Sequence, residues 1–372
     1  MTLPRIELAR GDVDRFDKSA ELEWLVTNGL GGFAAGTVAG ACTRRYHGLL
    51  VAALRPPVER VVLVAKLEPF AHYGGRVFAL TSNEYADGTI DPRGFESLSS
   101  FRLEGTLPVW EYVLGDALLE QRITMVHGEN TTVVQFALRR ASAPLRLDLR
   151  PLCTYRDYHS HTHGQGWALG FSHTDASCEV VAFDGARPYR IGSDKGRFEE
   201  EPGWYWSFRH RAETARGLDD REDLYGPGRF VVELEAGEAV TMTLTAEAQP
   251  RTPGAHAFSQ EQRRQEKLLA SVPRGEPEWV RQLALAADQF IVSRAGAGED
   301  ARTVIAGYPW FSDWGRDTMI ALPGLSLATG RGDVAASVLR TFGRFVSEGM
   351  LPNRFPDAGE IPEFNTVDAT LW

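Results

Sequence analysis

The hydrophobic pattern of the chain changes from a strand period to a helix period near Pro250. Before this point, short β-branched or alternating runs are bounded by turn signals, as at residues 60–67, 131–138 and 145–150. No helical crossover separates these runs, so the pattern favours an antiparallel β-sandwich over residues 1–250. Two further runs, 230–235 and 239–245, flank a glycine-containing turn and predict a β-hairpin.

The rest of the chain reads as a linker followed by helices. Residues 251–275 are polar, with a helical stretch expected around 260–270. From residue 276 onward the spacing is helical: Trp279, Leu283, Ala287 and Phe290 fall on one helix face. The sequence therefore predicts a second, helical domain over residues 276–372.

Three more helices are expected in that domain. One begins near Gly315 and runs to a C-cap at Gly330. Another begins at Asp333 as N-cap, places Val334, Val338, Phe342 and Phe345 on one face, and runs to Gly349. A last helix is only beginning at residues 366–369. The apolar faces of so few helices cannot enclose a core, so we expect the 372 residues to be the N-terminal part of a longer protein.

Composition excludes several classes of function. The net charge of −10 argues against a nucleic-acid partner, because phosphate binding needs clustered Lys and Arg. No apolar stretch is long enough to span a membrane, and the N-terminus lacks the apolar core of a signal peptide. The 3 cysteines lack metal-ligand spacing and suit a reducing compartment. A cytoplasmic location is therefore expected.

The segment 308–318, Tyr-Pro-Trp-Phe-Ser-Asp-Trp-Gly-Arg-Asp-Thr, concentrates aromatic and charged side chains just before a helix. Aromatic faces suit the C–H faces of a sugar, and charged groups bind its hydroxyls through strong hydrogen bonds. A buried aromatic loop with a structural Arg–Asp pair is the alternative. The density of polar groups among the rings favours a sugar-binding site.

Helix alternation brings a second group of carboxylates to the same place. Glu360, Glu363 and Asp368 precede or open the last helix. If consecutive helices run antiparallel, Asp317 and Asp368 lie at helix N-termini that share one end of the domain. Paired carboxyl groups in a cleft suit glycoside hydrolysis, in which one donates a proton to the departing oxygen. Simple helix capping by Asp368 and Thr366 explains the same residues equally well.

Two motifs in this region resemble those of the bacterial and archaeal glycogen debranching enzymes of the amylo-α-1,6-glucosidase type. The first is residues 306–324, and the second is residues 349–356 followed by 363–372. Segments 23–33 and 43–50 resemble the amino-terminal domain of the same family. The resemblance implies a β-sandwich followed by the start of an (α/α)6 barrel, and hydrolysis of α-1,6 branch points in glycogen or limit dextrin.

The resemblance also implies site residues. Asp368 is expected to be the general acid, whereas the catalytic base is expected beyond the chain, so that this piece alone would be inactive. Arg316 and Asp317 are expected to bind hydroxyls of the terminal glucose. The expected substrate-binding residues are Trp310, Asp313, Trp314, Arg316, Asp317, Asn353, Arg354, Glu363 and Asn365.

Other motifs favour structural roles. The glycine-rich residues 28–33 lack the spacing of a phosphate-binding or dinucleotide-binding loop, so we expect a tight turn and no cofactor. Residues 44–47, Arg-Arg-Tyr-His, either reach sugar or pack between domains, and packing is favoured. His159, His161 and His163 alternate and are expected to share one face of a strand, but without a bound metal.

Two other functions remain compatible with the sequence. One is another glucosidase or a phosphorylase of sandwich-plus-(α/α)6 architecture, which would act on α-1,4 links or a disaccharide. The other is a non-catalytic carbohydrate-binding module. An α-glucan is the expected partner in each reading except the disaccharide-specific enzyme.

Overall fold

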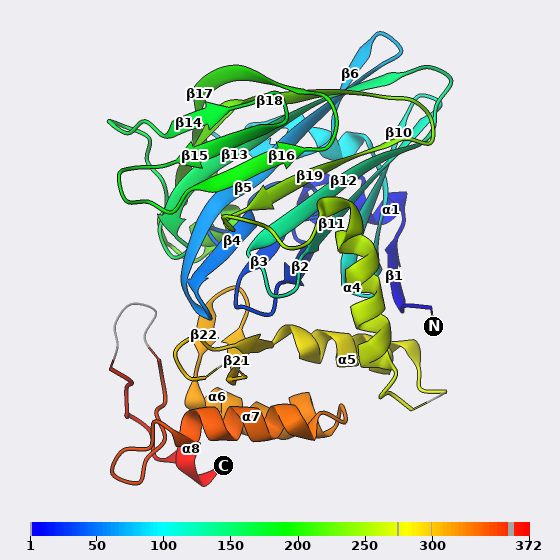
Figure 1. Ribbon diagram of the computed structural model, residues 1–372. Coiled ribbons are helices and arrows are strands. Elements are labelled where there is room, and N and C mark those ends of the chain that lie inside the picture. Colours follow the sequence, from blue (N-terminus) through cyan, green and yellow to red (C-terminus); the bar gives the residue numbers. More distant parts are fainter. Residues whose placement is uncertain (1, 274, 299, 356–360) are drawn as a thin grey trace.

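The computed structural model describes residues 2–273, 275–298, 300–355 and 361–372. Its first part is dominated by two large antiparallel sheets (Figure 1). Within the described residues, one sheet has nine strands. Their spatial order is β1 (Arg5–Leu8), β9 (Leu98–Glu104), β10 (Leu107–Leu114), β11 (Ala117–Met125), β12 (Thr131–Arg140), β19 (Ala239–Thr245), β16 (Tyr189–Ser193), β15 (Ser177–Val181) and β14 (Gly170–His173).

The second large sheet is eight-stranded over the same described ranges. Its main path runs β17 (Arg197–Arg209), β18 (Arg221–Leu234), β13 (Leu145–Asp157), β5 (Val58–Tyr73), β4 (Gly48–Arg55), β3 (Phe33–Thr37) and β2 (Glu23–Thr27), with β6 (Arg76–Ala79) paired to β5. Smaller elements around the sheets are β7 (Ser82–Glu84), β8 (Ile90–Arg93), α1 (Arg10–Val13), α2 (Phe16–Ser19), η1 (Gly94–Glu96) and α3 (Arg211–Ala215).

The largest hydrophobic core lies between these two sheets. Leu63 and Leu149 enter it from the eight-stranded sheet, while Val134, Phe136 and Met242 enter it from the nine-stranded sheet. All five side chains are fully buried. Because successive side chains of a strand point to opposite faces, alternate residues of each strand supply this core. The antiparallel β-rich first part predicted from the sequence is thus observed.

The predicted hairpin of 230–235 and 239–245 is wrong. The two runs are strands β18 and β19, but β18 pairs with β13 and β17, whereas β19 pairs with β12 and β16. The turn at residues 235–238 therefore carries the chain from one sheet to the other. A hairpin signal is local, but here both edges of each strand are taken by partners from elsewhere in the chain.

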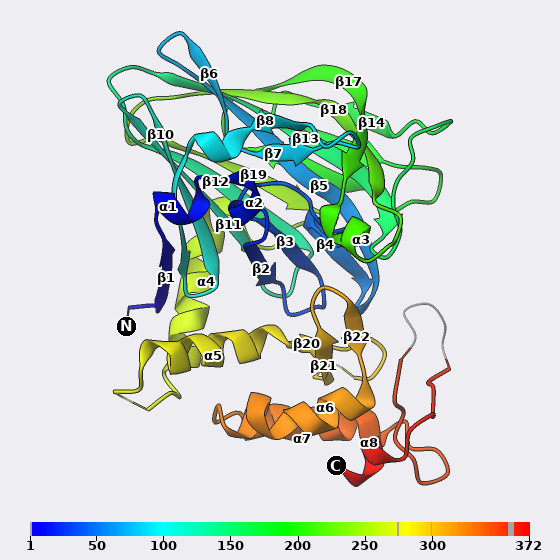
Figure 2. The same cartoon turned by 180° about the vertical axis from the view of Figure 1, so that it is seen from behind.

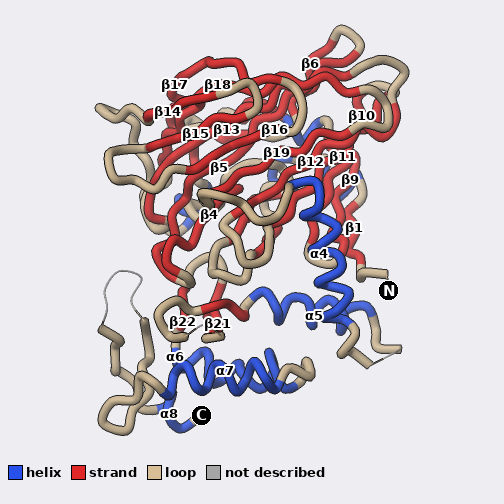
Figure 3. Tube along the Cα trace, viewed as in Figure 1, coloured by secondary structure: helices blue, strands red, loops and turns tan. Residues whose placement is uncertain are grey.

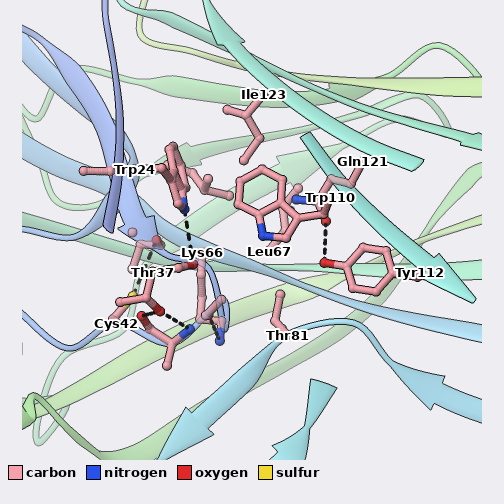
Figure 4. A pocket seen from close by; sticks show the side chains of 16 residues that line it. Trp24, Thr37, Cys42, Lys66, Leu67, Thr81, Trp110, Tyr112, Gln121 and Ile123 are labelled. Carbon is pink, nitrogen blue, oxygen red and sulfur yellow. Dashed lines mark hydrogen bonds between the residues drawn. The ribbon is translucent and has the colours of Figure 1, made fainter. Parts of the chain in front are cut away.

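A small cavity of about 40 Å³ lies inside the sandwich, beside Trp24, Trp110 and Ile123 (Figure 4). Lys66 reaches its wall, and burial lowers the pKa of this amine. Its Nζ donates to the carbonyls of Gly40 and Ser82, each at 3.0 Å, and also to Asn83. With its donors paired in this way, Lys66 fastens the turn at Gly40 and strand β7 to the sheet.

The second part of the chain is mainly helical and gathers at one end of the molecule (Figure 3). Its elements are α4 (Gly254–Leu269), α5 (Glu278–Gln289), β20 (Ile291–Ser293), β21 (Arg302–Gly307), β22 (Phe311–Asp313), α6 (Gly315–Leu322), the π-helical turn η2 (Pro323–Leu327), α7 (Gly332–Gly343) and α8 (Asp368–Leu371). Among the described residues, no helix combines the length and apolar character needed to cross a bilayer.

The predicted helices occur, with shifted ends and one different face. The helix expected to begin at Asp333 begins at Gly332 and ends at Gly343, well before Gly349. Val338 and Phe342 of this helix are fully buried, as its spacing predicted. On α5, by contrast, Trp279 is 65% and Leu283 59% exposed, so this predicted face is not a core face among the described residues.

The lower ends of β2, β3 and β4 lie next to the region of β20 to β22 (Figure 2). Hydrogen bonds and an aromatic cluster join the two parts there. The turn between β2 and β3 contains Gly29 and Gly31, both at positive φ, and the Gly29 carbonyl accepts a hydrogen bond from Ser293 N at 2.9 Å. This agrees with the turn expected from the glycine spacing. Beside it, Phe33 and Tyr158 of the sandwich side pack in one cluster with Tyr308.

Candidate active site

The candidate site is built around the start of α6. Trp314 is the N-cap residue, and Arg316 and Asp317 occupy the exposed first turn. Gly315 lies so close to the backbone of Pro352 that a Cβ would overlap the Pro352 carbonyl oxygen. Glycine is therefore required where the helix meets the segment that begins at Pro352.

That segment forms a short irregular ladder against α6. Gly315 N donates to Asn353 O at 2.7 Å, and Asn353 N donates to Glu363 O at 2.8 Å. The side chain of Asn353 donates to Asn365 Oδ1 at 2.8 Å and accepts from Arg316 N at 3.4 Å. Four of the residues expected at the site are thus held together by this ladder.

The ladder also brings Asp368 to the first turn of α6. Arg316 Nε lies 3.1 Å from Asp368 Oδ2, and their side chains are 55% and 38% exposed. Helix alternation had predicted that Asp317 and Asp368 share one end of the domain. In the structure Arg316, the neighbour of Asp317, makes the direct contact with Asp368, while the Asp317 side chain is exposed.

Aromatic rings flank the charged pair. The guanidinium of Arg354 lies over the Trp314 ring at 5.5 Å, and Arg354 also pairs with Glu363 at 3.6 Å. Phe311 meets Trp314 edge-on at 6.1 Å and is 50% exposed. The arrangement offers apolar ring faces and charged hydrogen-bonding groups on one side of α6. Glu360, also expected near this place, lies outside the described residues.

Asp313 lies on the opposite, buried side of the segment. Its carboxylate is fully buried, pairs with Arg294 and accepts from Thr303 Oγ1 at 3.0 Å. Burial raises the pKa of Asp313, although Arg294 opposes the shift. Asp313 was expected among the substrate-binding residues. In this position it instead anchors residues 311–313 to Arg294 and Thr303, and it presents no surface to a ligand.

Trp310 faces the sandwich. Its ring lies 5.3 Å from the guanidinium of Arg44, and its carbonyl accepts from Tyr158 Oη at 3.3 Å. Arg44 is itself paired with Glu23 at 2.7 Å. The first of the four residues 44–47 therefore touches the aromatic segment directly.

The other three residues of that motif serve packing, as expected. Arg45 pairs with the buried Glu213 at 3.2 Å, and Tyr46 joins the aromatic cluster between the two parts. His47 is buried, and its Nδ1 accepts from Thr43 N at 3.1 Å. Burial, with the neighbouring charges of His210 and Arg44, lowers the pKa of His47 to about 3.

Arg60 is a residue that sequence reasoning missed. It extends from β5, is fully buried, and donates from Nη1 to the carbonyl of Phe311 at 3.0 Å. Its guanidinium also lies over the rings of Phe33, Tyr158 and Tyr308 at 6.0, 5.2 and 5.5 Å. The signal that could have found it is a charged residue directly before the apolar strand run 61–65.

The three alternating histidines do not share a strand face. β13 ends at Asp157, so they lie in the turn and loop that follow. The His161 side chain is only 2% exposed and contacts His210 at 3.1 Å, whereas the His163 side chain is 57% exposed and pairs with Asp219. Over the described ranges, no group of three His, Cys, Asp or Glu side chains is arranged to hold a metal ion.

Comparisons with known proteins match both parts of the chain. The family model described as "Glycogen debranching enzyme N terminal" matches residues 22–241. The model described as "Amylo-alpha-1,6-glucosidase" matches residues 285–372. The chain is also similar to the glycogen debranching enzyme of Saccharomyces cerevisiae, with 40% identity over 80 residues, which are 20% of this chain and 5% of the yeast protein.

Two solved structures are similar over most of this chain. A bacterial glucoamylase complexed with acarbose matches with a TM-score of 0.35 and 12% identity, over 95% of this chain and 51% of that chain. A family GH92 α-mannosidase from Bacteroides thetaiotaomicron matches with a TM-score of 0.29 and 10% identity, over 100% of this chain and 50% of that chain. The chain thus spans about half the length of these two structures and a small part of the yeast relative.

Proposed function

This chain belongs to the glycogen debranching enzyme family, and on that premise we propose that it is part of a glycoside hydrolase that removes α-1,6-linked glucose at branch points of glycogen or limit dextrin. The observation that carries the proposal is the 3.1 Å pairing of Arg316 with Asp368. It joins two motifs that are far apart in the sequence at one exposed surface, beside aromatic rings that suit a sugar.

The helical part is proposed to be the opening of an (α/α)6 barrel. The succession of α5, α6, α7 and α8 after the β-rich part supports this, as does the family. In such an architecture the N-termini of alternate helices meet at one end, where a substrate can bind. The contact between the first turns of α6 and α8 fits that arrangement.

Asp368 is the proposed general acid. Glycoside hydrolysis requires one carboxyl group that protonates the oxygen of the departing sugar. Asp368 is 38% exposed and can therefore meet a ligand at the surface. A second carboxylate must activate water on the opposite face of the sugar, at about 6.5–9.5 Å from the first for an inverting reaction. We assign none of the described carboxylates to that second role.

Arg316 and Asp317 are proposed to bind hydroxyls of the terminal glucose. Both are exposed, and a guanidinium and a carboxylate offer a donor fork and an acceptor pair. Arg316 must then exchange Asp368 for the sugar, which frees the Asp368 carboxyl to carry its proton. Trp314 would cover the apolar face of the ring, while Asn353, Arg354, Glu363 and Asn365 keep the two segments in register.

Replacement of Asp368 tests this proposal. In the full-length protein, Asp368→Asn should lower kcat on limit dextrin by about 10²- to 10⁴-fold, the usual contribution of a positioned acid. Glycogen binding should change little, because the amide keeps the size of the side chain. Asp333→Asn on α7 is the matched control and should keep wild-type turnover. Unchanged turnover in Asp368→Asn would remove Asp368 from catalysis.

Two further measurements separate the alternatives. Arg316→Ala should weaken glucan binding and turnover together, since the lost contact serves both. Release of glucose 1-phosphate that depends on added phosphate would identify a phosphorylase and exclude hydrolysis as the main reaction. Under the carbohydrate-binding alternative, Asp368→Asn would leave any measured hydrolysis untouched.

A further inference from the structure

Two tryptophans stand side by side on the edge strand β17. Trp204 and Trp206 are two residues apart, so their side chains project from the same side of the strand. Their ring centroids are 5.6 Å apart and the ring planes differ by 31°. Trp206 is 49% exposed, while Trp204 is partly buried against the core. The two rings are in contact at this distance, and the pair, with Trp206 outermost, is here termed the β17 platform.

Neighbouring residues hold the β17 platform in place. Tyr225 of β18 meets the Trp204 ring edge-on at 5.4 Å, and Trp167 lies 6.0 Å from it. Gly164 packs so closely on the same ring that a Cβ there would overlap it. Trp204, fixed in this way, is a rigid support for the Trp206 ring beside it, and a rigid site loses little conformational entropy when a ligand binds.

Polar groups border the β17 platform. Ser207 has a positive φ of 61°, and Asp223 holds this position by accepting from Ser207 N at 2.8 Å and from Gly164 N at 3.1 Å. Within the described part of the chain, neither indole N–H of the platform donates to a protein acceptor. Both N–H groups therefore remain available as hydrogen-bond donors to a ligand.

A short segment links the β17 platform to the aromatic segment that precedes α6. Tyr158 donates to the carbonyl of Trp310, and Gly164, six residues later, packs on Trp204. Six residues span at most about 20 Å. A polymer of several sugar units can therefore contact the platform with one part and reach toward α6 with another.

The chemistry of the β17 platform indicates its ligand. Ring faces with free N–H donors at their edges match a pyranose, whose faces are apolar and whose rim carries hydroxyls. Only Trp206 of the platform has about half of its surface exposed. The exposed area of one tryptophan side chain falls far below the roughly 800 Å² that each partner buries in a stable protein interface. A neutral glucan is also indifferent to the net charge of −10.

We infer that Trp204 and Trp206 form a second glucan-binding site on the sandwich, separate from the site at α6. The inference rests on the proposed function in one respect, since it takes the polymeric substrate to be an α-glucan. The β17 platform binds an outer chain of the polymer by stacking and thereby raises the local concentration of branch ends near α6.

The test compares Trp206→Ala with the wild type in the full-length protein. Affinity electrophoresis through glycogen-containing gels measures polymer binding, and kinetics on a short branched oligosaccharide measures the α6 site alone. Trp206→Ala should weaken glycogen binding about threefold to tenfold, the worth of one stacked ring. It should leave kcat/KM for the short substrate unchanged. Trp206→Phe, which keeps a ring, should recover most of the binding.

A matched control separates this effect from a general loss of a surface indole. Trp279→Ala removes an exposed tryptophan from α5 and should not weaken glycogen binding. Melting temperature checks that each variant is folded. Unchanged glycogen binding in Trp206→Ala overturns the inference, and it is the result expected if Trp206 docks a protein instead.

The two proposals fail in different ways. If the protein does not hydrolyse α-1,6 links but Trp206→Ala loses glycogen binding, the proposed function fails and the β17 platform stands. If hydrolysis is observed and Trp206→Ala binds glycogen like the wild type, the β17 platform fails alone. A wild-type protein that neither binds glycogen nor cleaves it contradicts both.

Discussion

The sandwich and the helical part differ in how completely they cover their apolar and charged side chains. In the sandwich, apolar side chains fill the space between two sheets, and charged groups are tied to one another, as where Arg102 pairs with Glu104, Glu111 and Glu120. In the helical part, Leu283 of α5 is 59% exposed and Arg316 of α6 is 55% exposed.

This difference suggests that the two parts contribute differently to stability and to ligand binding. Stability comes mainly from the sandwich, where burial removes the largest apolar area from water. Apart from Trp206 of the β17 platform, the exposed groups suited to recognition lie at α6 and α8. Arg60 connects the two, because it is rooted in β5 and donates to the backbone of the aromatic segment. Four substitutions test how far the contrast holds.

The largest effect is expected in the sandwich core. Phe136→Ala on β12 should lower the free energy of unfolding by about 3–5 kcal/mol, because the fully buried ring leaves a cavity between the sheets. Urea denaturation of the purified chain measures this loss. Val77→Ala, at a 59% exposed position of β6, is the control and should cost less than about 0.5 kcal/mol. Equal losses in both variants would contradict a closed core.

The contact between Arg60 and the backbone of the aromatic segment should give the next largest effect. Arg60→Met should destabilise the chain by about 3 kcal/mol, because it leaves the Phe311 carbonyl without its buried donor and removes the stacked cation. Hydrogen exchange should rise first at residues 305–311. Arg76→Met removes an exposed arginine over Phe78 and should cost under about 1 kcal/mol. Unchanged hydrogen-exchange rates at residues 305–311 in Arg60→Met would show that other contacts hold this segment on the sandwich.

A pH-dependent effect of intermediate size is expected at His47. Its pKa is lowered to about 3 in the folded chain from an ordinary value of 6.5, so the unfolded chain binds the proton more readily. The stability that neutral His47 contributes is complete above pH 6.5 and is lost as pH falls toward 3. Between pH 6.5 and 5.5 the loss is about 1 kcal/mol, and it approaches about 1.4 kcal/mol for each further pH unit toward 4.

His47→Asn should remove this part of the slope of unfolding free energy against pH. Urea titrations at several pH values measure it. His163→Asn, with a side chain 57% exposed, provides the control and should retain the wild-type slope. A His47→Asn slope equal to that of the wild type would mean that His47 takes up its proton in the folded state as readily as in the unfolded state.

The smallest effect is expected on the outer face of α5. Leu283→Ser should change the unfolding free energy of the 372-residue chain by less than about 0.5 kcal/mol, because the side chain is 59% exposed. The same denaturation experiment measures it. A loss above about 1.5 kcal/mol would instead reveal that this face is covered in solution.

The hydrophobic periodicity predicted where helices and strands occur better than it predicted which elements pack against them. The spacing of Val334, Val338 and Phe342 identified the buried face of α7, because that face packs on adjacent parts of the same region. The same reasoning misjudged α5, where Trp279 and Leu283 share a face that no described residue buries. Periodicity reveals an apolar face but not what covers it.

Long-range pairing explains the other differences. The runs that became β18 and β19 carry a sound local hairpin signal, yet their partners come from other parts of the chain. The burial of Arg60 likewise depends on Tyr308 and Phe311, which follow it by about 250 residues. The alternation of antiparallel helices predicted that Asp317 and Asp368 lie at one end of the domain. The contact found there is between Asp368 and Arg316, the neighbour of Asp317.

The crossing between β18 and β19 has a mechanical consequence. β19 leads through residues 246–253 into α4 and lies inside its sheet, with β12 on one side and β16 on the other. Hydrogen bonds on both edges of β19 therefore resist a pull on the helical part. The N-terminal strand β1 is an edge strand with β9 as its one neighbour in the sheet, so fewer hydrogen bonds resist a pull on it. Tension between the two ends should thus peel β1 away while the anchorage of the helical part still holds.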